Sequence, residues 1–104
     1  AYLSPETIRG EPVDLRIDIY YLGATFYHVL NGSPPFIDET LEGMLQKHLD
    51  TPPVPLQEKL PSVSSTISDV VQRMLAKRPE DRFQSYQEII SALSTASPAD
   101  APVF

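Results

Sequence analysis

The residues that could carry chemistry are few in this chain, and their spacing does not assemble a site. His28 and His48 stand at metal-ligand spacing neither with each other nor with a nearby carboxylate. We expect His28, which lies in an apolar stretch, to be a buried structural histidine. The adjacent acids at 38–39 and 80–81 suit solvated turns or helix starts, because acid–base catalysis needs convergent carboxylates with different pKa values. The residues alone predict no catalytic side chain and no metal ligand.

Two further kinds of chemistry are missing from the sequence. The chain has no cysteine, which excludes a disulfide framework, a thiolate metal site and a cysteine nucleophile. The glycine-rich loops that let backbone N–H groups approach phosphates, G-x-x-x-x-G-K-S/T and G-x-G-x-x-G, are also absent. On its residues alone, the chain is interpreted as a non-catalytic protein.

Length and charge narrow the range of partners. The 104 residues suit one small domain or part of a larger one. Asp and Glu number 14 against 8 for Lys and Arg, and the net charge of −6 disfavours nucleic-acid and anionic membrane surfaces. The longest apolar-rich stretch, Ile19–Leu30, is shorter than the roughly 20 residues of a membrane span, and the first residues show no signal-peptide pattern. We expect a cytoplasmic chain with no membrane segment and no nucleic-acid partner.

One segment, residues 17–31, is apolar on nearly every side. Asp18 near its start is a predicted N-terminal cap, and Asn31-Gly32 is a typical helix end. The β-branched and aromatic content also permits a buried strand, but the length between cap and glycine favours a helix. A helix that is apolar all round is usually buried. We therefore expect this helix at the centre of the fold.

Three amphipathic helices are predicted around this central helix, from apolar residues that recur at helical spacing: residues 39–50, 66–77 and 85–94. Asp38 is the candidate cap of the first, and Thr66 with Asp69 resembles a capping pair in the second. The third begins with the capping box Ser85-x-x-Glu88. The predicted fold class is all-α, a buried central helix with three amphipathic helices around it.

The remaining segments are predicted as turns and connections. A short helical turn at Pro5–Ile8 has Ser4 as its cap. Residues 51–65 are rich in proline and serine and predict a loop, most simply a stiff connection, although the PPVP run could bind a partner as polyproline II. Residues 94–104 are small, polar and proline-bearing, and we expect a linker or disordered tail.

Four motifs in a fixed order resemble the C-terminal lobe of a eukaryotic-like Ser/Thr protein kinase. The residues in and around these motifs are most similar to those of bacterial members of the family. In that family an A-P-E or S-P-E triplet closes the activation segment, and here the triplet is Ser4-Pro5-Glu6. The pattern D-x-W/Y-x-L-G, which opens the central helix of the lobe, occurs at 18–23. The patterns G-x-x-P-F and P-x-x-R occur at 32–36 and 79–82.

The resemblance implies a fold, a parent activity and partners. Residues 1–93 would be the C-terminal part of a protein kinase domain, the substrate-side helical base that supports the catalytic loop. The parent would transfer the γ-phosphoryl group of ATP to protein Ser or Thr hydroxyls with Mg²⁺. The glycine-rich loop, strand lysine, H-R-D-x-x-x-x-N and D-F-G motifs of that chemistry do not occur here. The segment alone would bind neither ATP nor Mg²⁺, would be inactive, and would have the N-terminal half of the domain and a protein substrate as partners.

The resemblance also implies roles for individual residues. Glu6 would form a buried salt bridge with Arg82 and tie the end of the activation segment to the helical base. Asp18 would accept hydrogen bonds from backbone N–H groups of the catalytic loop, beside its role as a cap. Gly23 would allow close packing of the central helix.

Tyr2 and Leu3 fall where the family shapes the pocket for the substrate residue after the phosphoacceptor, although both suit an ordinary apolar core equally well. Two alternative functions stay open. The parent could be a pseudokinase or truncated product that acts as a binding scaffold, with residues 39–50 and the loop after them as its docking surface. The chain could also be an unrelated acidic helical adaptor.

Overall fold

The computed structural model describes residues 3–94, and these residues form helices and connecting turns without a strand. Their α-helices are α1 (Pro5–Ile8), α2 (Leu15–Asn31), α3 (Leu41–Asp50), α4 (Leu56–Lys59), α5 (Ser65–Met74) and α6 (Tyr86–Leu93), and the 3-10 helix η1 (Pro79–Asp81) precedes α6. The all-α fold class is confirmed. Tyr2 and residues 95–104 of the predicted tail lie outside the described residues.

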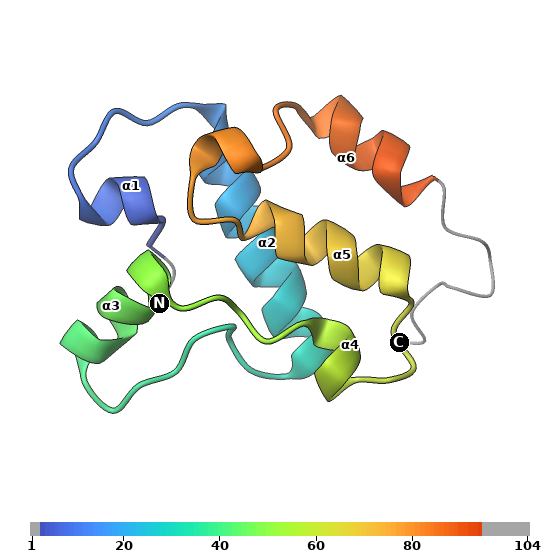
Figure 1. Cartoon of the computed structure of the whole chain (residues 1–104), viewed down its shortest axis with the longest axis horizontal. Helices are drawn as coiled ribbons and strands as arrows, with labels where there is room; N and C mark the ends of the chain where they lie inside the picture. The colour runs from blue at the N-terminus through green and yellow to red at the C-terminus, as the bar shows by residue number, and fades with distance from the viewer. Residues whose placement is uncertain (1–2, 95–104) are drawn as a thin grey trace.

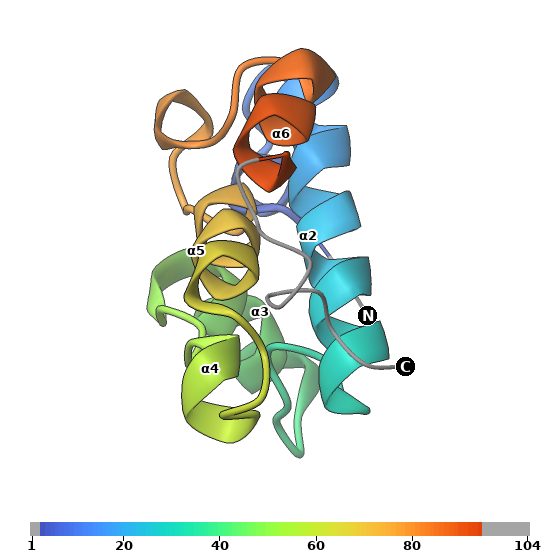
Figure 2. The ribbon, with the colours of Figure 1, turned by 90° about the vertical axis from the view of Figure 1, so that its right-hand side faces the viewer.

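The longest helix, α2, crosses the middle of the molecule, and α5 packs against it (Figure 1). Seen from the side, α2 forms one layer and α4 and α5 form the other (Figure 2). The two helices approach closely at Gly23, where an added Cβ would lie 2.7 Å from the Cβ of Met74. Such a distance is shorter than van der Waals contact, so α2 and α5 can pack this way only with glycine at position 23.

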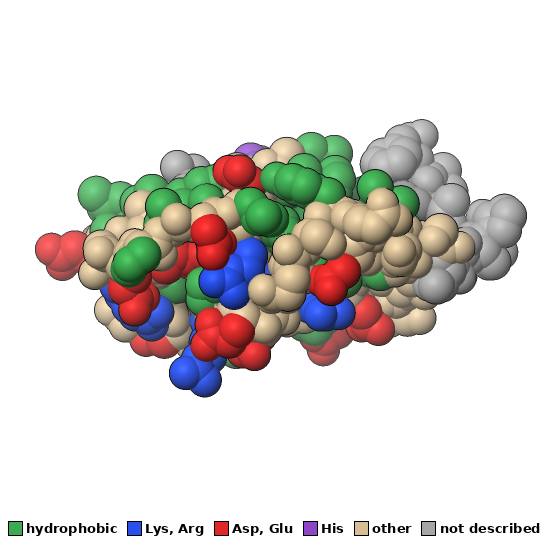
Figure 3. Space-filling model, turned by 90° about the horizontal axis from the view of Figure 1, so that it is seen from above, with side chains coloured by type: hydrophobic (Ala, Val, Ile, Leu, Met, Phe, Trp, Pro, Cys, Tyr) green, Lys and Arg blue, Asp and Glu red, His purple; other side chains and the backbone are tan. Residues whose placement is uncertain are grey.

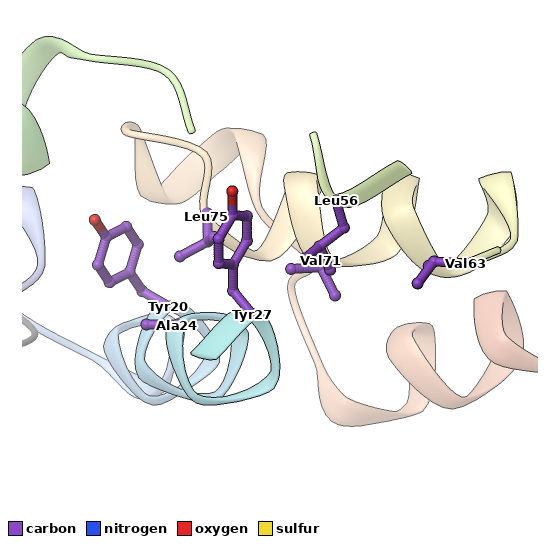
Figure 4. Packing of buried hydrophobic residues seen from close by; sticks show 7 residues of the cluster. All are labelled: Tyr20, Ala24, Tyr27, Leu56, Val63, Val71 and Leu75. Atoms are coloured by element: carbon purple, nitrogen blue, oxygen red, sulfur yellow. The ribbon is translucent and has the colours of Figure 1, made fainter. Parts of the chain in front are cut away.

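The core lies between these layers, in two clusters that share α2 and α5. In the first, Tyr20, Ala24 and Tyr27 point from α2 toward Val71 and Leu75, next to residues of the α4 region (Figure 4). The second joins α2 and α5 to α6, through these buried residues: Ile19, Val70, Met74, Phe83 and Ile89. The first cluster therefore sits at the α4 side of the crossing, and the second at the α6 side.

One side of α2 is not buried within the described residues, so the prediction of a helix covered all round is only half right. Phe26 is 38% exposed and Val29 is 65% exposed. An apolar groove of about 310 Å³ runs between α2, α5 and α6, and Leu30, Ile67 and Leu93 also line it. Seen from above, hydrophobic side chains gather along one edge of the molecule, and charged side chains intermix along the opposite edge (Figure 3).

Three predicted helix caps are wrong by two to four residues. Asp14, not Asp18, caps α2, since its carboxylate accepts the Arg16 N–H and Asp18 already lies inside the first turn. Thr40 caps α3, where Asp38 was predicted. A cap must have extended backbone, and both observed caps do. Periodicity does not reveal which of several neighbouring polar residues adopts that backbone.

The third wrong cap belongs to α5, where Ser64 accepts the N–H of Ile67 in place of the predicted Thr66–Asp69 pair. The same helix ends at Met74 rather than Lys77. Its early end has a structural consequence, because the chain beyond it turns its carbonyls toward Arg82.

Residues 51–65 are not entirely a loop, because they contain α4. Leu56 opens this short helix and is only 1% exposed, so its side chain anchors the segment in the core. The capping box of α6 is confirmed in part. The Ser85 hydroxyl accepts the Glu88 N–H, but the Glu88 carboxylate accepts the N–H of Gln84 instead of that of Ser85.

Candidate functional site

The most constrained polar site in the described residues joins two segments that are far apart in the sequence. Arg82 Nη1 donates to Glu6 Oε2 at 2.6 Å, and Arg82 Nη2 donates to Glu6 Oε1 at 2.8 Å. The side chains are 0% and 4% exposed. This is the bidentate geometry in which a guanidinium and a carboxylate interact most strongly. The salt bridge expected from the resemblance is present.

The remaining donors of Arg82 are also used. Its Nε donates to the carbonyl of Ala76 at 2.8 Å, Nη1 donates to the carbonyl of Arg16 at 3.0 Å, and Nη2 donates to the carbonyl of Lys77 at 3.3 Å. All five N–H groups of the guanidinium therefore have an acceptor. One side chain thus binds α1, the first turn of α2 and the segment that follows α5 together, which a lysine with a single ammonium could not do.

The carboxylate of this ion pair stays charged. Burial by itself raises the pKa of Glu6, but the hydrogen bonds and the positive charge of Arg82 outweigh burial and hold the pKa below its ordinary value. The Ser4 hydroxyl caps α1 by accepting the Thr7 N–H, and Ser4 is itself buried. The Ser4-Pro5-Glu6 motif therefore begins α1, where Ser4 caps the first turn and Arg82 holds the Glu6 carboxylate.

A further set of contacts supports the same site from outside. Arg16 binds the Asp14 carboxylate through Nε and Nη2 and donates from Nη1 to the side-chain oxygen of Gln84 at 3.1 Å. Gln84 in turn donates to the carbonyl of Arg82 at 2.7 Å. The carbonyl of Arg82 is thus held by Gln84, and Gln84 by Arg16, two residues that the sequence motifs did not indicate.

Two of the predicted site residues lie at the surface. Asp18 is exposed in the first turn of α2, and no hydrogen bond or ion pair within residues 3–94 engages its carboxylate. Leu3 is 39% exposed. The structure therefore does not bring either residue into the Glu6–Arg82 site.

A buried polar contact that sequence reasoning missed lies beside the ion pair. The Tyr20 hydroxyl and His48 Nδ1 are 2.6 Å apart, and the two residues are 0% and 1% exposed. The Cζ of Arg82 lies 4.8 Å from the centre of the Tyr20 ring. Burial raises the pKa of the Tyr20 phenol, which stays protonated at neutral pH. The signal available in the sequence was a histidine on the apolar face of residues 39–50.

The ring of Phe36 continues this cluster. It meets the His48 ring edge-on with centroids 4.8 Å apart, and the Nζ of Lys77 lies 4.1 Å from its centre. Lys77 also donates to the carbonyl of Lys47 near the end of α3 at 3.0 Å. Burial lowers the pKa of Lys77 to about 8. His28, predicted to be buried, is only half-buried.

The described residues hold no group of three or more metal-ligating side chains, and they include no helix long and apolar enough to span a membrane. The polar contacts that they do contain join backbone segments: the guanidinium of Arg82 holds the Ser4-Pro5-Glu6 turn, and the Tyr20–His48 contact joins α2 to α3.

Comparison with known protein families finds a match that covers most of the chain, including all four motifs. The family model that matches the chain is "Protein kinase domain", over residues 1–93. Serine/threonine-protein kinase PknB of Mycobacterium leprae is 38% identical over 104 residues, which cover 97% of this chain and 17% of that protein. Serine/threonine-protein kinase Pkn1 of Myxococcus xanthus is 42% identical over 95 residues, covering 91% of this chain and 14% of that protein.

Solved structures agree with this match. The PknI kinase domain of Mycobacterium tuberculosis superposes with a TM-score of 0.68 at 32% identity, covering 91% of this chain and 33% of that one. The twitchin kinase region from C. elegans superposes with a TM-score of 0.74 at 24% identity, covering 97% of this chain and 17% of that one, which supports the fold alone. The chain thus spans a small part of each relative.

Proposed function

The chain belongs to the protein kinase domain family, and from this premise we propose that its parent protein is an active Ser/Thr protein kinase. In this proposal residues 1–93 supply the substrate-side helical base of the kinase domain, and residues 94–104 serve as a linker beyond it. The parent transfers the γ-phosphoryl group of ATP to Ser or Thr hydroxyls of a protein substrate. The segment acts in the cytoplasm.

The observation that carries the proposal is the complete Glu6–Arg82 site. A buried ion pair is costly unless every donor and acceptor is satisfied, and here all five donors of Arg82 have acceptors. This ion pair holds the Ser4-Pro5-Glu6 turn firmly against the helical base, as a kinase that positions a protein substrate requires. A scaffold with the same fold would need the ion pair as well, so an activity assay has to separate the two functions.

Two surface features fit the rest of such a domain. The exposed Asp18 carboxylate, in the first turn of α2, is available to accept backbone N–H groups of a catalytic loop. The apolar groove along Phe26 and Val29 offers a surface for further helices of the domain. The PknI kinase domain extends well beyond the part that this chain matches, which is 33% of its length. Tyr2 and Leu3 would shape the pocket beside the phosphoacceptor.

ATP and Mg²⁺ would be held by the part of the domain that these residues do not supply. The described residues contain no cluster of metal ligands, and the sequence contains no glycine-rich phosphate loop. When bound there, Mg²⁺-ATP provides the phosphoryl group. The contribution of this chain is to hold the substrate side in place, through Glu6 and Arg82 at one end and Asp18 below the catalytic loop.

The test uses the full-length protein that contains this chain, incubated with radiolabelled ATP, Mg²⁺ and a general protein substrate. We expect label on Ser or Thr residues, identified by mass spectrometry. A Glu6→Gln variant should lose most of this activity, and Glu11→Gln, which removes an exposed partner of Arg9, should keep it. A full-length protein that neither binds ATP nor transfers label would contradict the proposal and favour the scaffold.

A further inference from the structure

A hydrogen bond between two fully buried side chains joins α2 to α3. Tyr20 is on α2 and His48 is near the end of α3, and the 2.6 Å between the phenol oxygen and Nδ1 is a short contact in a site that water does not reach. An unmade hydrogen bond at such a place leaves a buried polar atom without its solvation. The position of α3 relative to α2 is therefore tied to this contact.

The same tyrosine lies against the ion pair. Its ring is under the Arg82 guanidinium, with 4.8 Å between Cζ and the ring centre, and Arg82 holds Glu6 by two hydrogen bonds. A continuous series of buried contacts thus leads from the Ser4-Pro5-Glu6 turn to α3. A shift of Arg82 would change the contact between its guanidinium and the Tyr20 ring. A shift of that ring would in turn stretch the hydrogen bond to His48.

We propose that the Tyr20–His48 hydrogen bond is a positioning contact that couples α3 to the Glu6–Arg82 ion pair. With the contact made, α3 keeps its place only while the ion pair is intact, so that the end of the activation segment controls the surface that α3 presents to a protein substrate. The second part rests on the proposed kinase function. The coupling itself concerns this chain alone.

Two other contacts join α3 to its neighbours and offer alternative routes by which the ion pair could influence α3. Lys77 donates to the carbonyl of Lys47, and α1 itself lies beside α3 (Figure 1). A coupling that passes through these contacts would survive the loss of the Tyr20 hydroxyl. The decisive measurement is therefore whether the ion pair still influences α3 after that hydroxyl is removed.

The helix α2 carries a matched control. The Tyr27 hydroxyl donates to the carbonyl of Val54 at 2.7 Å, beyond the end of α3. Tyr20→Phe and Tyr27→Phe each delete one phenol oxygen from the same helix, but only Tyr20 binds His48. His48→Asn is the conservative variant, because its amide can place a polar atom near the position of Nδ1, and His48→Leu removes that atom.

The experiment measures hydrogen–deuterium exchange of the α3 amides in the full-length protein. We expect Tyr20→Phe and His48→Leu to exchange about tenfold faster than wild type, and Tyr27→Phe and His48→Asn to stay within about twofold. Glu6→Gln should also accelerate α3 exchange, and adding Tyr20→Phe to it should bring little further change. Ser4→Ala, which removes the cap of α1 together with the hydroxyl's contacts to Thr7 and Glu6, is the milder perturbation of the ion-pair site if Glu6→Gln does not fold.

Two results would overturn the proposal. One is an equal effect of Tyr20→Phe and Tyr27→Phe on α3. The other is a double variant whose acceleration is the product of the two single ones, as independent sites require. A kinetic readout tests the substrate part: Tyr20→Phe should raise the KM for the protein substrate about fivefold and leave the KM for ATP unchanged, and an equal rise of both would contradict it. If the wild type transfers no phosphate, the proposed function fails, while the exchange data still decide the coupling.

Discussion

The two sides of α2 differ in how far their side chains are covered by other residues of this chain. Toward α5 and α3, the helix meets side chains of this chain, and the buried polar groups of Arg82 and Tyr20 there have hydrogen-bond partners. Toward the groove, Phe26 and Val29 stay partly or mostly exposed. An apolar pattern on all sides of a helix therefore says that each side will be covered, but not that the cover comes from nearby sequence.

The two sides of α2 also differ in how precisely they determine the arrangement of the elements packed against them. The groove side is lined by apolar side chains, which restrict a packing partner mainly through its volume and shape. The ion-pair side requires one guanidinium at one position, because five acceptors from three segments converge on it. We infer that the ion pair fixes the arrangement of the elements and that apolar burial supplies most of the stability.

The largest effect should come from breaking the ion-pair side. Glu6→Gln keeps the shape of the side chain and leaves the Arg82 charge buried without its counterion, which should lower the free energy of unfolding by about 3–5 kcal/mol. The measurement is chemical denaturation of the full-length protein. The exposed pair Arg78–Glu80 provides the control, since Glu80→Gln should change stability by less than about 1 kcal/mol. Equal effects of the two variants would show that burial of the Glu6 pair has no energetic weight.

The next largest effect should come from the groove side. If further helices of the domain cover the groove, Val29→Asp places a carboxylate in an apolar contact and should cost the full-length protein about 2–4 kcal/mol. Val13→Asp is the matched control, because Val13 is 55% exposed and does not line the groove. Denaturation of both variants measures the difference. A Val29→Asp protein as stable as wild type would mean that the groove side of α2 faces solvent in the complete protein.

The sequence was sufficient for the parts of the fold that depend on ordered motifs or strong periodicity. The helix at 17–31, the capping box at Ser85 and the Glu6–Arg82 contact could be predicted because each leaves a local pattern or matches an ordered motif of a known family. The groove could not be predicted, since periodicity records that a residue is apolar and not which element covers it.

Other features depend on tertiary contacts that leave no pattern. α4 forms among prolines because Leu56 is buried in the core, and a Pro-rich composition does not show that burial. The Tyr20–His48 bond joins residues 28 positions apart, each of which reads as an ordinary member of an apolar helix face. Buried polar pairs of this kind become visible only when the helices are placed.

A smaller effect should come from the closest contact between α2 and α5. Gly23→Ala would put a Cβ 2.7 Å from the Cβ of Met74, an atom fixed to the backbone of α5, so that one helix must move. We expect a loss of about 1–3 kcal/mol, despite the better helix propensity of alanine. Gly23→Ser should cost more than Gly23→Ala in thermal denaturation, because it adds another atom. A stabilised Gly23→Ala protein would show that the helices do not approach this closely.

The smallest effect concerns the titration of Glu6 and tests whether the ion pair favours the charged form of this carboxylate. Burial raises the pKa of Glu6, but the hydrogen bonds and charge of Arg82 dominate and lower it below its ordinary value of 4.5. A carboxyl group whose pKa is lower in the folded state contributes stability that is fully present above the unfolded pKa. That stability is lost as the pH falls through the folded pKa, because protonation then favours the unfolded chain.

The stability difference between wild type and Glu6→Gln should therefore be constant from pH 8 to about pH 5.5 and should shrink only in more acid solution. Glutamine has no proton to bind, so the free energy of unfolding of Glu6→Gln should fall less steeply below pH 4.5 than that of wild type. Glu80→Gln is a suitable comparison, because the Glu80 carboxylate is exposed and lies outside the ion pair. Parallel acid slopes for wild type and Glu6→Gln would mean that Arg82 does not favour the ionised carboxylate. The ion-pair side of α2 would then add no pH dependence to the stability of the protein, as expected for the groove side, which carries no such pair.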